Sequence, residues 1–329
     1  MRHLVTGGAG FIGSHLTDAL VARGDEVLVL DDLSTGRRAN VEHLLSGGRV
    51  ELVEGSTLDR DLVEDCMASV DTCFHLASAV GVGLILAKPV KSLLSTVRGT
   101  DTVLSAAAAR RRPFIFTSTS EVYGKNPGPW LREDADRLLG SPSKARWLYA
   151  NAKTFGESLA LGYFRDERVP AVVARLFNTV GPRQSADHGM VLPRFVRQAL
   201  AGEDLTVYGD GSQVRCFCHV SDAVDALLRL AGESAAAGNA YNVGTSEEIS
   251  VGELARRVVE RTGSASGIRL VPYEQVYTDG FEEPLRGKPD TTALRELTGW
   301  RPLRDLDAAI AEVVAEGRAE ARPAAYVAH

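Results

Sequence analysis

Two residues four positions apart, Tyr149 and Lys153, form the clearest chemical pair in this sequence. The spacing places both side chains on one face of a helix. A tyrosine hydroxyl has an ordinary pKa of about 10, so it acts as a base near neutral pH only if a nearby cation stabilises the phenolate. Because Lys153 can supply that charge, the pair predicts a centre that removes a proton from a substrate.

A cluster of hydroxyl groups precedes a glutamate in the stretch TSTSEVYG, residues 117–124, which follows the apolar run PFIF. We expect a buried strand to end here. Thr119, Ser120 and Glu121 can hydrogen-bond a polar substrate, so they join the candidate catalytic residues. A second interpretation remains open, because strand-end hydroxyls also cap backbone groups, and at least one of Ser118, Thr119 and Ser120 fits that role better.

Three glycines near the start, Gly7, Gly10 and Gly13, have the spacing GxxGxxG between an expected strand and an expected helix. Glycine lets the backbone approach a pyrophosphate, and the amino end of a helix favours its negative charge. The next expected strand, EVLVLDD, ends about 20 residues on at Asp31 and Asp32, where a carboxylate accepts both ribose hydroxyls and repels a 2′-phosphate. These features predict a dinucleotide site that prefers NAD to NADP.

Two alternatives at this site remain open. Arg37 and Arg38 follow the acidic pair and can in principle meet a 2′-phosphate, although exposed arginines are usually just solvated. Asp31 can cap a turn instead of binding a ribose. Because the glycine pattern precedes these residues, we favour the NAD site over both alternatives.

Short apolar runs alternate with helical patterns, as in HLVTG, FIGSHLTDALVARG, EVLVLDD, VELVEG, TCFHLAS, PFIFTST and AVVARLFN. The alternation predicts an α/β fold, a Rossmann-type doubly wound parallel sheet. We expect an NAD-binding domain at 1–180 plus about 217–247, where HVSDAVDALLRLAG, with Ser221 as N-cap, and AYNVG return to the sheet. A smaller, interleaved C-terminal substrate domain takes 181–216 and 248–329.

The amino-acid composition limits the kinds of partner that the protein is expected to bind. With 37 Lys+Arg against 43 Asp+Glu among 329 residues, the net charge of −6 argues against nucleic-acid binding. No apolar stretch is long enough to span a membrane and no leader precedes the first strand, so we expect a cytoplasmic protein without a membrane partner. The four cysteines include no CxxC pair, which favours simple packing over a metal site, and CFC at 216–218 fits a strand.

At this point the sequence resembles the extended short-chain dehydrogenase/reductase family that acts on nucleotide sugars, over nearly its whole length. The matching pieces are TGGAGFIG, TSTSEVYG, YANAK, RLFNTVGPR and LTVYGDGSQVRCFCHVSD. The resemblance implies that Thr119 hydrogen-bonds the sugar C4 oxygen, that Tyr149 removes its proton, and that Glu121 with Ser120 positions the sugar carboxylate or a water. It also implies a homodimer in which segments 98–112 and 149–167 pair across a two-fold axis.

The strand-end triplet separates the activities of that family. In its 4,6-dehydratases the triplet resembles Thr-Asp-Glu, and in its UDP-galactose 4-epimerases Ser-Ser-Ala. Thr119, Ser120 and Glu121 are similar to the pattern of UDP-glucuronate decarboxylases, which need no acid for a leaving hydroxyl. The expected activity is therefore NAD-dependent decarboxylation of UDP-glucuronate to UDP-4-keto-pentose or UDP-xylose. The alternatives are a 4-epimerase of UDP-glucose or UDP-glucuronate, a dTDP-glucose 4,6-dehydratase and a non-enzymatic NAD sensor.

The resemblance also assigns binding residues. The expected cofactor-binding residues are Gly7, Gly10, Phe11, Ile12, Gly13, Asp31, Asp32, Ser34, Thr35, Gly36, Ser56, Thr57, Leu76, Ala77, Ser78, Thr117, Tyr149, Lys153 and Val180. The expected residues for the UDP-sugar are Glu121, Asn178, Arg183, Val191, Leu192, Tyr208, Arg215 and Arg286, although Tyr208 fits a packing role equally well. No metal is expected.

Three departures from the family pattern bear on these assignments. Gly287 stands where relatives carry an arginine, with Arg286 one position earlier, so the sugar end is held by a shifted loop or by other residues. Ser56 stands where many relatives carry an aspartate that meets adenine. The segment 76–83 is more similar to bacterial relatives described as 4-epimerases than to animal decarboxylases.

Overall fold

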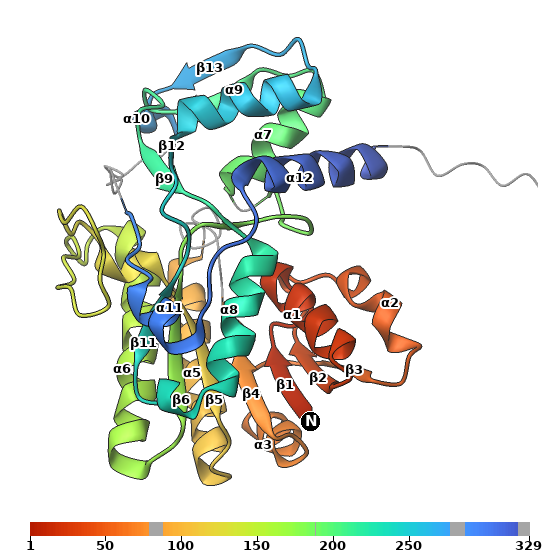
Figure 1. The fold of residues 1–329 in the computed structure, drawn as a ribbon, viewed down its shortest axis with the longest axis vertical. Coiled ribbons are helices and arrows are strands. Elements are labelled where there is room, and N and C mark those ends of the chain that lie inside the picture. Colours follow the sequence, from red (N-terminus) through yellow and green to blue (C-terminus); the bar gives the residue numbers. More distant parts are fainter. Residues whose placement is uncertain (79–87, 188, 277–286, 322–329) are drawn as a thin grey trace, which may run out of the picture.

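A seven-stranded parallel sheet forms the centre of the protein, in the order β11-β6-β5-β4-β1-β2-β3 (Figure 1). The computed structural model describes residues 1–78, 88–187, 189–276 and 287–321. The strands are β1 (Arg2–Thr6), β2 (Glu26–Asp31), β3 (Val50–Glu54), β4 (Thr72–His75), β5 (Phe114–Thr119), β6 (Ala171–Leu176) and β11 (Ala240–Val243). The predicted fold class, a doubly wound parallel sheet, is confirmed.

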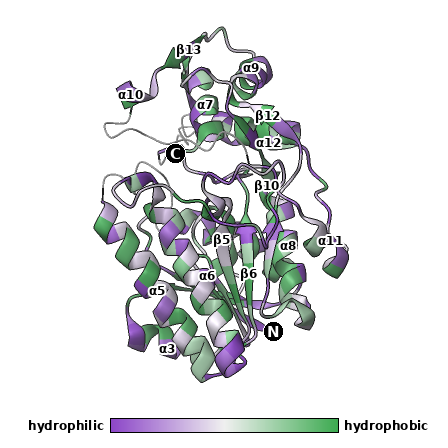
Figure 2. Cartoon of the chain, turned by 90° about the vertical axis from the view of Figure 1, so that its left-hand side faces the viewer, coloured by the Kyte–Doolittle hydropathy of each residue, from purple (hydrophilic) through white to green (hydrophobic). Residues whose placement is uncertain are grey.

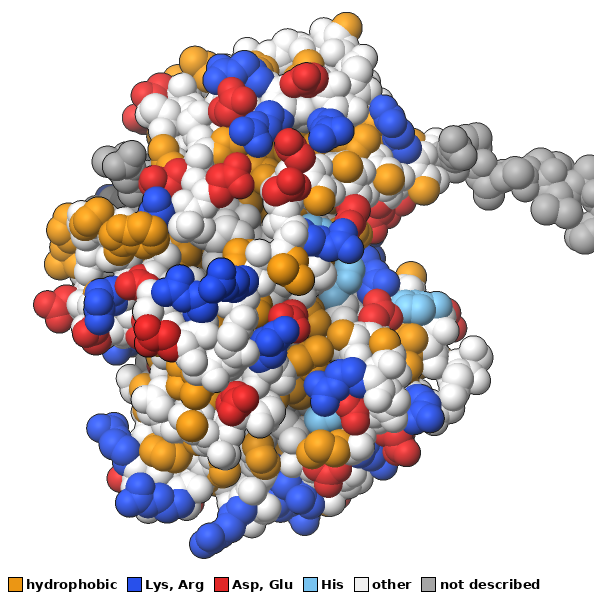
Figure 3. All heavy atoms as spheres, viewed as in Figure 1, with side chains coloured by type: hydrophobic (Ala, Val, Ile, Leu, Met, Phe, Trp, Pro, Cys, Tyr) orange, Lys and Arg blue, Asp and Glu red, His pale blue; other side chains and the backbone are white. Residues whose placement is uncertain are grey.

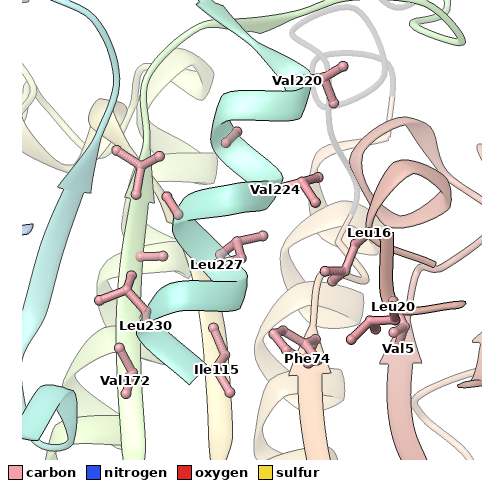
Figure 4. Packing of buried hydrophobic residues seen from close by; sticks show 14 of the residues in the cluster. Val5, Leu16, Leu20, Phe74, Ile115, Val172, Val220, Val224, Leu227 and Leu230 are labelled. Atoms are coloured by element: carbon pink, nitrogen blue, oxygen red, sulfur yellow. The ribbon is translucent and has the colours of Figure 1, made fainter. Parts of the chain in front are cut away.

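Helices cover both faces of the sheet, which is why its central strands read as continuous apolar runs. Within β1, Leu4 packs on one face and Val5 on the other. Figure 4 shows the second face, where α1 (Phe11–Ala22) and α8 (Val220–Gly232) bury Leu20 and Leu227 against the strands. The opposite face carries α3 (Arg60–Ala68), α5 (Pro89–Ala109) and α6 (Leu148–Glu167).

A second, smaller lobe lies beyond the carboxyl ends of the strands. Its core joins α7 (Val191–Leu200), α9 (Val251–Thr262) and α12 (Leu306–Glu320) with β8 (Leu205–Tyr208). Figure 2 shows that hydrophobic and hydrophilic residues alternate along α7 and α9, and the hydrophobic ones include Phe195 and Leu254 of this core. The remaining elements are η1 (Arg38–Asn40), α2 (Glu42–Leu45), η2 (Ser120–Tyr123), η3 (Ala145–Trp147), β7 (Thr179–Val180), β9 (Val214–Cys216), β10 (Cys218–His219), η4 (Ser234–Ala236), β12 (Glu248–Ser250), β13 (Ile268–Val271), α10 (Tyr273–Val276) and α11 (Thr292–Thr298).

The chain returns from the small lobe to the sheet through α8 and β11, as the sequence predicted. β11 pairs in parallel with β6 and closes one edge of the sheet. The exact domain limits stay a prediction; two residues assigned to the NAD-binding domain near those limits, Val180 and Phe217, pack in the core of the small lobe.

Two local predictions differ from the structure. The N-cap of α8 is His219, whose ring nitrogen accepts a hydrogen bond from the Ser221 backbone N–H, so the prediction of Ser221 as the cap is wrong. The helix begins at Val220, one residue before the serine. This is possible because the imidazole nitrogen of His219 can accept a hydrogen bond as a hydroxyl oxygen does. The CFC stretch is not one strand: β9 ends at Cys216 and β10 begins at Cys218. All four cysteines are buried and free, as the packing interpretation expected.

Candidate active site

A cavity of about 560 Å³ lies at the carboxyl ends of the strands, where open parallel sheets bind ligands. Its walls come from the turns after β1, β2, β4 and β5, from the start of α6, and from the loop that leads into the small lobe. The surface is hollowed between the sheet and the small lobe (Figure 3). Glycine turns, hydroxyls and charged side chains therefore meet in one chamber.

The glycine turn between β1 and α1 is packed so closely that side chains would not fit within it. A Cβ on Gly13 would lie 2.1 Å from the Gly7 carbonyl oxygen, and Gly7 itself has a φ of +72°. The N-cap of α1 is Gly10, which offers no side-chain cap to the first backbone N–H groups of the helix. This end of α1 therefore has the bare backbone donors that a pyrophosphate binds.

The Asp31 carboxylate is held in place at the end of β2. Its oxygens accept the backbone N–H groups of Ala9 and Leu33, both at 2.9 Å. Burial raises the pKa of this carboxyl group, with the two backbone donors opposing the shift. A Cβ on Gly36 would lie 2.9 Å from the Asp31 oxygens. Asp31 thus makes local turn contacts, as the capping alternative allowed, and also lines the cavity.

Most of the predicted cofactor residues line the cavity, and their individual roles stay predictions. Those that line it are Gly7, Gly10, Phe11, Ile12, Gly13, Asp31, Asp32, Ser34, Thr35, Ser56, Thr57, Leu76, Ala77, Ser78, Thr117, Tyr149 and Lys153. Gly36 stands behind Asp31 and Val180 is buried in the small-lobe core. Arg38 pairs with Glu42 and Glu54 at the surface, as the solvated reading predicted, whereas Arg37 lines the cavity.

The hydroxyls at the end of β5 each have a partner. Thr117 donates to the His75 carbonyl at 3.0 Å, and Ser118 donates to the buried Glu157 carboxylate at 2.6 Å. Thr119 accepts the Glu121 backbone N–H at 3.2 Å, which is the strand-end cap that the alternative reading expected. Thr119 and Ser120 line the cavity all the same.

Tyr149 and Lys153 lie on one face of α6, with the Lys153 Nζ 5.9 Å from the tyrosine ring centroid. The same Nζ donates to the Thr117 carbonyl at 2.8 Å. Burial lowers the pKa of Lys153 to about 7, although the Glu157 charge opposes this. Burial, reinforced by the charge of Glu121, raises the pKa of Tyr149. Burial thus opposes the charged forms of both groups, the ammonium of Lys153 and the phenolate of Tyr149.

Glu121 has a partner that the sequence analysis missed, Arg146. The guanidinium forms a fork with the carboxylate, in which Nη1 donates to Oε2 and Nη2 donates to Oε1 at 3.1 Å. Both residues line the cavity. No spacing pattern marks this contact, because Arg146 in η3 meets Glu121 in η2 only in the folded chain.

The predicted substrate residues are more scattered. Asn178 lines the cavity and donates to the Cys216 carbonyl at 3.1 Å. Arg183 also lines it, but its guanidinium pairs with Asp18 and its backbone N–H with Glu316. Val191 and Leu192 begin α7, where Leu192 is fully buried.

Two further predicted substrate residues, Tyr208 and Arg215, lie outside the lining of this cavity. Tyr208 stacks with the Arg194 guanidinium, 4.1 Å from its ring centroid. The pKa of Arg215 is lowered by burial, and the charges of Tyr273, Arg146 and Glu121 also act on it. Arg286 lies outside the described residues. Of the departures noted above, Gly287 lies near Leu131, and Ser56 Oγ accepts the Leu58 N–H.

Among the described ranges, no group of metal-ligating side chains occurs and no helix has the length and apolar character of a membrane span. The fold and the cavity together define a dinucleotide-binding protein with a tyrosine and lysine centre. Residues 3–244 match the family described as the NAD dependent epimerase/dehydratase family. The chain belongs to that family, which confirms both the resemblance and NAD as the cofactor.

Individual members of the family show which known proteins the chain resembles. It is 43% identical to UDP-N-acetyl-alpha-D-glucosaminuronate decarboxylase of Bacillus cytotoxicus over 92% of each chain. It is 40% identical to UDP-glucuronic acid decarboxylase 2 of Arabidopsis thaliana over 92% of this chain, and spans 65% of that protein. The solved structure of UDP-glucose 4-epimerase from Thermotoga maritima with UDP-glucose matches with a TM-score of 0.88 at 28% identity, covering 98% of this chain and all of the other.

Proposed function

We propose that the protein is an NAD-dependent decarboxylase of UDP-linked uronic acids, with UDP-glucuronate as the first substrate to test. One observation carries the proposal: the strand end after β5 presents Glu121 with a hydroxyl at Ser120, in the same cavity as Tyr149, in a chain whose relatives are named uronate decarboxylases. A dehydratase would need an acid at position 120 to protonate a leaving hydroxyl.

The residues divide the reaction between them. When bound, NAD supplies the acceptor for the hydride on the sugar C4. Tyr149 takes the proton of the C4 hydroxyl, Lys153 stabilises the phenolate, and Thr119 hydrogen-bonds the C4 oxygen. A ketone at C4 lies β to the carboxylate on C5, so carbon dioxide leaves as its bonding electrons flow into an enolate.

Glu121 acts in the second half of the reaction, the loss of carbon dioxide and the protonation of C5. With Ser120 it positions the C5 substituent or the water that returns a proton to C5. The negative charge of Glu121 also disfavours a second carboxylate beside it in the ground state, which favours loss of the substrate carboxylate. Neither role requires the acid that a dehydratase carries.

The names of two relatives suggest two candidate uronate substrates. The plant relative is named for UDP-glucuronic acid, whereas the bacterial relative with 43% identity is named for the 2-acetamido sugar. Both share the carboxylate and the C4 hydroxyl on which the chemistry depends, and they differ at C2. Comparing carbon dioxide release from the two UDP-uronates assigns the preferred C2 substituent.

The decisive test is the product. Incubation with UDP-glucuronate and NAD should release carbon dioxide and leave UDP-4-keto-pentose, UDP-xylose or both, identified by mass. Inversion at C4 of an intact six-carbon sugar would contradict the decarboxylase and favour the 4-epimerase. Binding of NAD with no turnover of UDP-glucuronate, its 2-acetamido analogue, UDP-glucose or dTDP-glucose would favour the NAD sensor.

Glu121→Gln should slow carbon dioxide release by roughly 100-fold while UDP affinity stays within about twofold, because the carboxylate lies at the sugar end of the site. The exposed Glu64, in α3, provides the matched control Glu64→Gln. Equal losses in the two variants would remove Glu121 from the mechanism.

We also propose that the protein is a cytoplasmic homodimer. Exposed apolar side chains on the neighbouring helices α5 and α6 support the dimer. Four reduced, buried cysteines support a reducing compartment.

A further inference from the structure

Arg146 is fixed more firmly than the carboxylate it holds. Its side chain is 9% exposed, whereas that of Glu121 is 28% exposed. The guanidinium lies 5.6 Å from the ring centroid of Trp147, which is fully buried. Both residues line the cavity, and the arginine is the more deeply buried member of the pair.

The pair joins the two elements that carry the proposed chemistry. Glu121 lies in η2, directly after β5 and its Thr119. Arg146 lies in η3, directly before α6 and its Tyr149. A bidentate guanidinium and carboxylate contact fixes orientation as well as distance, which a single hydrogen bond does not.

The charges around the pair also matter for Tyr149. The negative charge of Glu121 is the electrostatic contribution, after burial, that raises the pKa of the tyrosine. Positive charge on Arg146 opposes this field because the guanidinium contacts the same carboxylate. Arg215 adds a second cation within electrostatic range of both Glu121 and Arg146.

We propose that Arg146 is a positioning residue, which holds the Glu121 carboxylate at the sugar end of the cavity in a fixed place relative to Tyr149. The inference rests on the proposed function and extends it to a residue outside the proposed catalytic set. It commits Arg146 to acting through Glu121 and not through the carboxylate of the substrate.

A double-mutant cycle separates these two roles. We would compare the wild type, Arg146→Gln, Glu121→Gln and the double variant, measuring carbon dioxide release from UDP-glucuronate and UDP affinity by calorimetry. Arg146→Gln should lower kcat by about 100-fold, as a displaced group does, with UDP affinity within about twofold. In the Glu121→Gln background the same change should cost less than about threefold, because residues that act as a unit are not additive.

Two further readouts exclude a merely structural effect. Arg146→Lys keeps the charge and one contact, so its kcat should be about tenfold higher than that of Arg146→Gln. Its thermal midpoint shows whether it is folded, so it can be used should the glutamine variant fail to fold. The rising limb of the pH–rate profile should move to higher pH in Arg146→Gln and to lower pH in Glu121→Gln. These shifts follow from the charged groups that act on Tyr149, namely Lys153 in α6 and Glu121 in η2, and from those that act on Glu121, namely Arg146 in η3 and Arg215 in β9.

The control is Arg132→Gln, which alters an exposed arginine paired with Asp134. An equal loss from Arg146→Gln with and without Glu121 would overturn the inference and make Arg146 a direct ligand of the substrate. Full activity of Arg146→Gln would overturn it as well. If the wild type releases no carbon dioxide from either UDP-uronate, the proposed function fails and the inference falls with it, an outcome distinct from the other two.

Discussion

Removing the phenolic oxygen of Tyr149 is the smallest change that tests proton transfer at the sugar C4. Tyr149→Phe should lower turnover by about 10³-fold or more, because a positioned general base and its hydrogen bond are both lost. UDP and NAD affinities should change little, since the ring keeps its place in the cavity wall. Isothermal calorimetry beside product analysis provides the test, and near wild-type turnover would end the assignment of Tyr149 as the base.

Asp31 is the residue that we predict decides the choice between NAD and NADP. Asp31→Ala should weaken NAD binding by roughly 10- to 100-fold, the cost of a charged hydrogen-bond acceptor, and should narrow the preference for NAD over NADP. Fluorescence titration with both cofactors measures the ratio. The unmodified protein binding both dinucleotides equally would contradict the role, and Asp32→Ala shows whether the neighbouring carboxylate shares it.

Site residues that belong to a local sequence motif were predictable from the sequence. Those whose role depends on tertiary contacts were not. Gly13 and Lys153 follow spacing rules within one turn or one helix, so their motifs reveal them. Arg146 acquires its meaning only because η2 and η3 meet in the fold. The buried pair of Glu157 and Arg175, at 2.8 Å, escaped notice for the same reason.

At the scale of elements, the turn between β1 and α1 depends on the absence of a side chain. Gly13→Ala would place a methyl group 2.1 Å from the Gly7 carbonyl oxygen, so α1 must move away from the sheet. We expect a loss of about 1–3 kcal/mol in the free energy of unfolding, together with weaker NAD binding. Urea denaturation with and without NAD measures both effects.

Gly232 at the end of α8 provides the matched control, because a Cβ there would meet no atom within 4 Å. Gly232→Ala should leave stability unchanged or slightly raised. Similar losses in the two variants would show that the close packing at Gly13 does not decide the stability of the turn.

The order and type of the elements followed from periodicity, but their exact ends did not. Continuous apolar runs predicted the parallel strands because both faces of the sheet are covered. The start of α8 was missed by two residues because His219, a side chain with no strong capping preference, accepts the first backbone donor. The break at Phe217 was missed because both flanking cysteines are buried, so no alternation marks it.

At the scale of the whole molecule, stability should fall as the pH drops below neutrality. His75 is fully buried between the hydroxyls of Thr6 and Thr100, and burial lowers its pKa to about 3. The unfolded chain binds a proton at this residue below pH ~6.5 while the folded protein does not, so each pH unit below that value costs about 1.4 kcal/mol.

Urea denaturation at pH 7.5 and pH ~5.5 should show this loss, with the pKa of His3 and His15, also lowered by burial, adding in the same direction. The His75 ring resonances should not titrate between these values. A ring that titrates in this range, or a stability that does not decrease, would contradict the buried neutral imidazole.

The last prediction concerns association. Val90 and Leu94 lie one turn apart on α5, and Phe155 lies on the neighbouring α6; these apolar side chains are 69%, 39% and 46% exposed. Exposed apolar groups on packed helices favour a second copy of the same surface, because a two-fold axis brings each patch against itself. Light scattering should therefore give the mass of a dimer.

A single charge on that surface tests the interface without touching the cavity. Phe155→Glu should weaken dimerisation by at least about tenfold, since a carboxylate buried between two copies has no partner. Leu303→Glu alters the even more exposed Leu303, in the segment before α12, and should leave the dimer intact. A wild-type protein that is monomeric at all concentrations would refute the dimer. Equal weakening of dimerisation by Phe155→Glu and Leu303→Glu would show that the interface does not lie on α6.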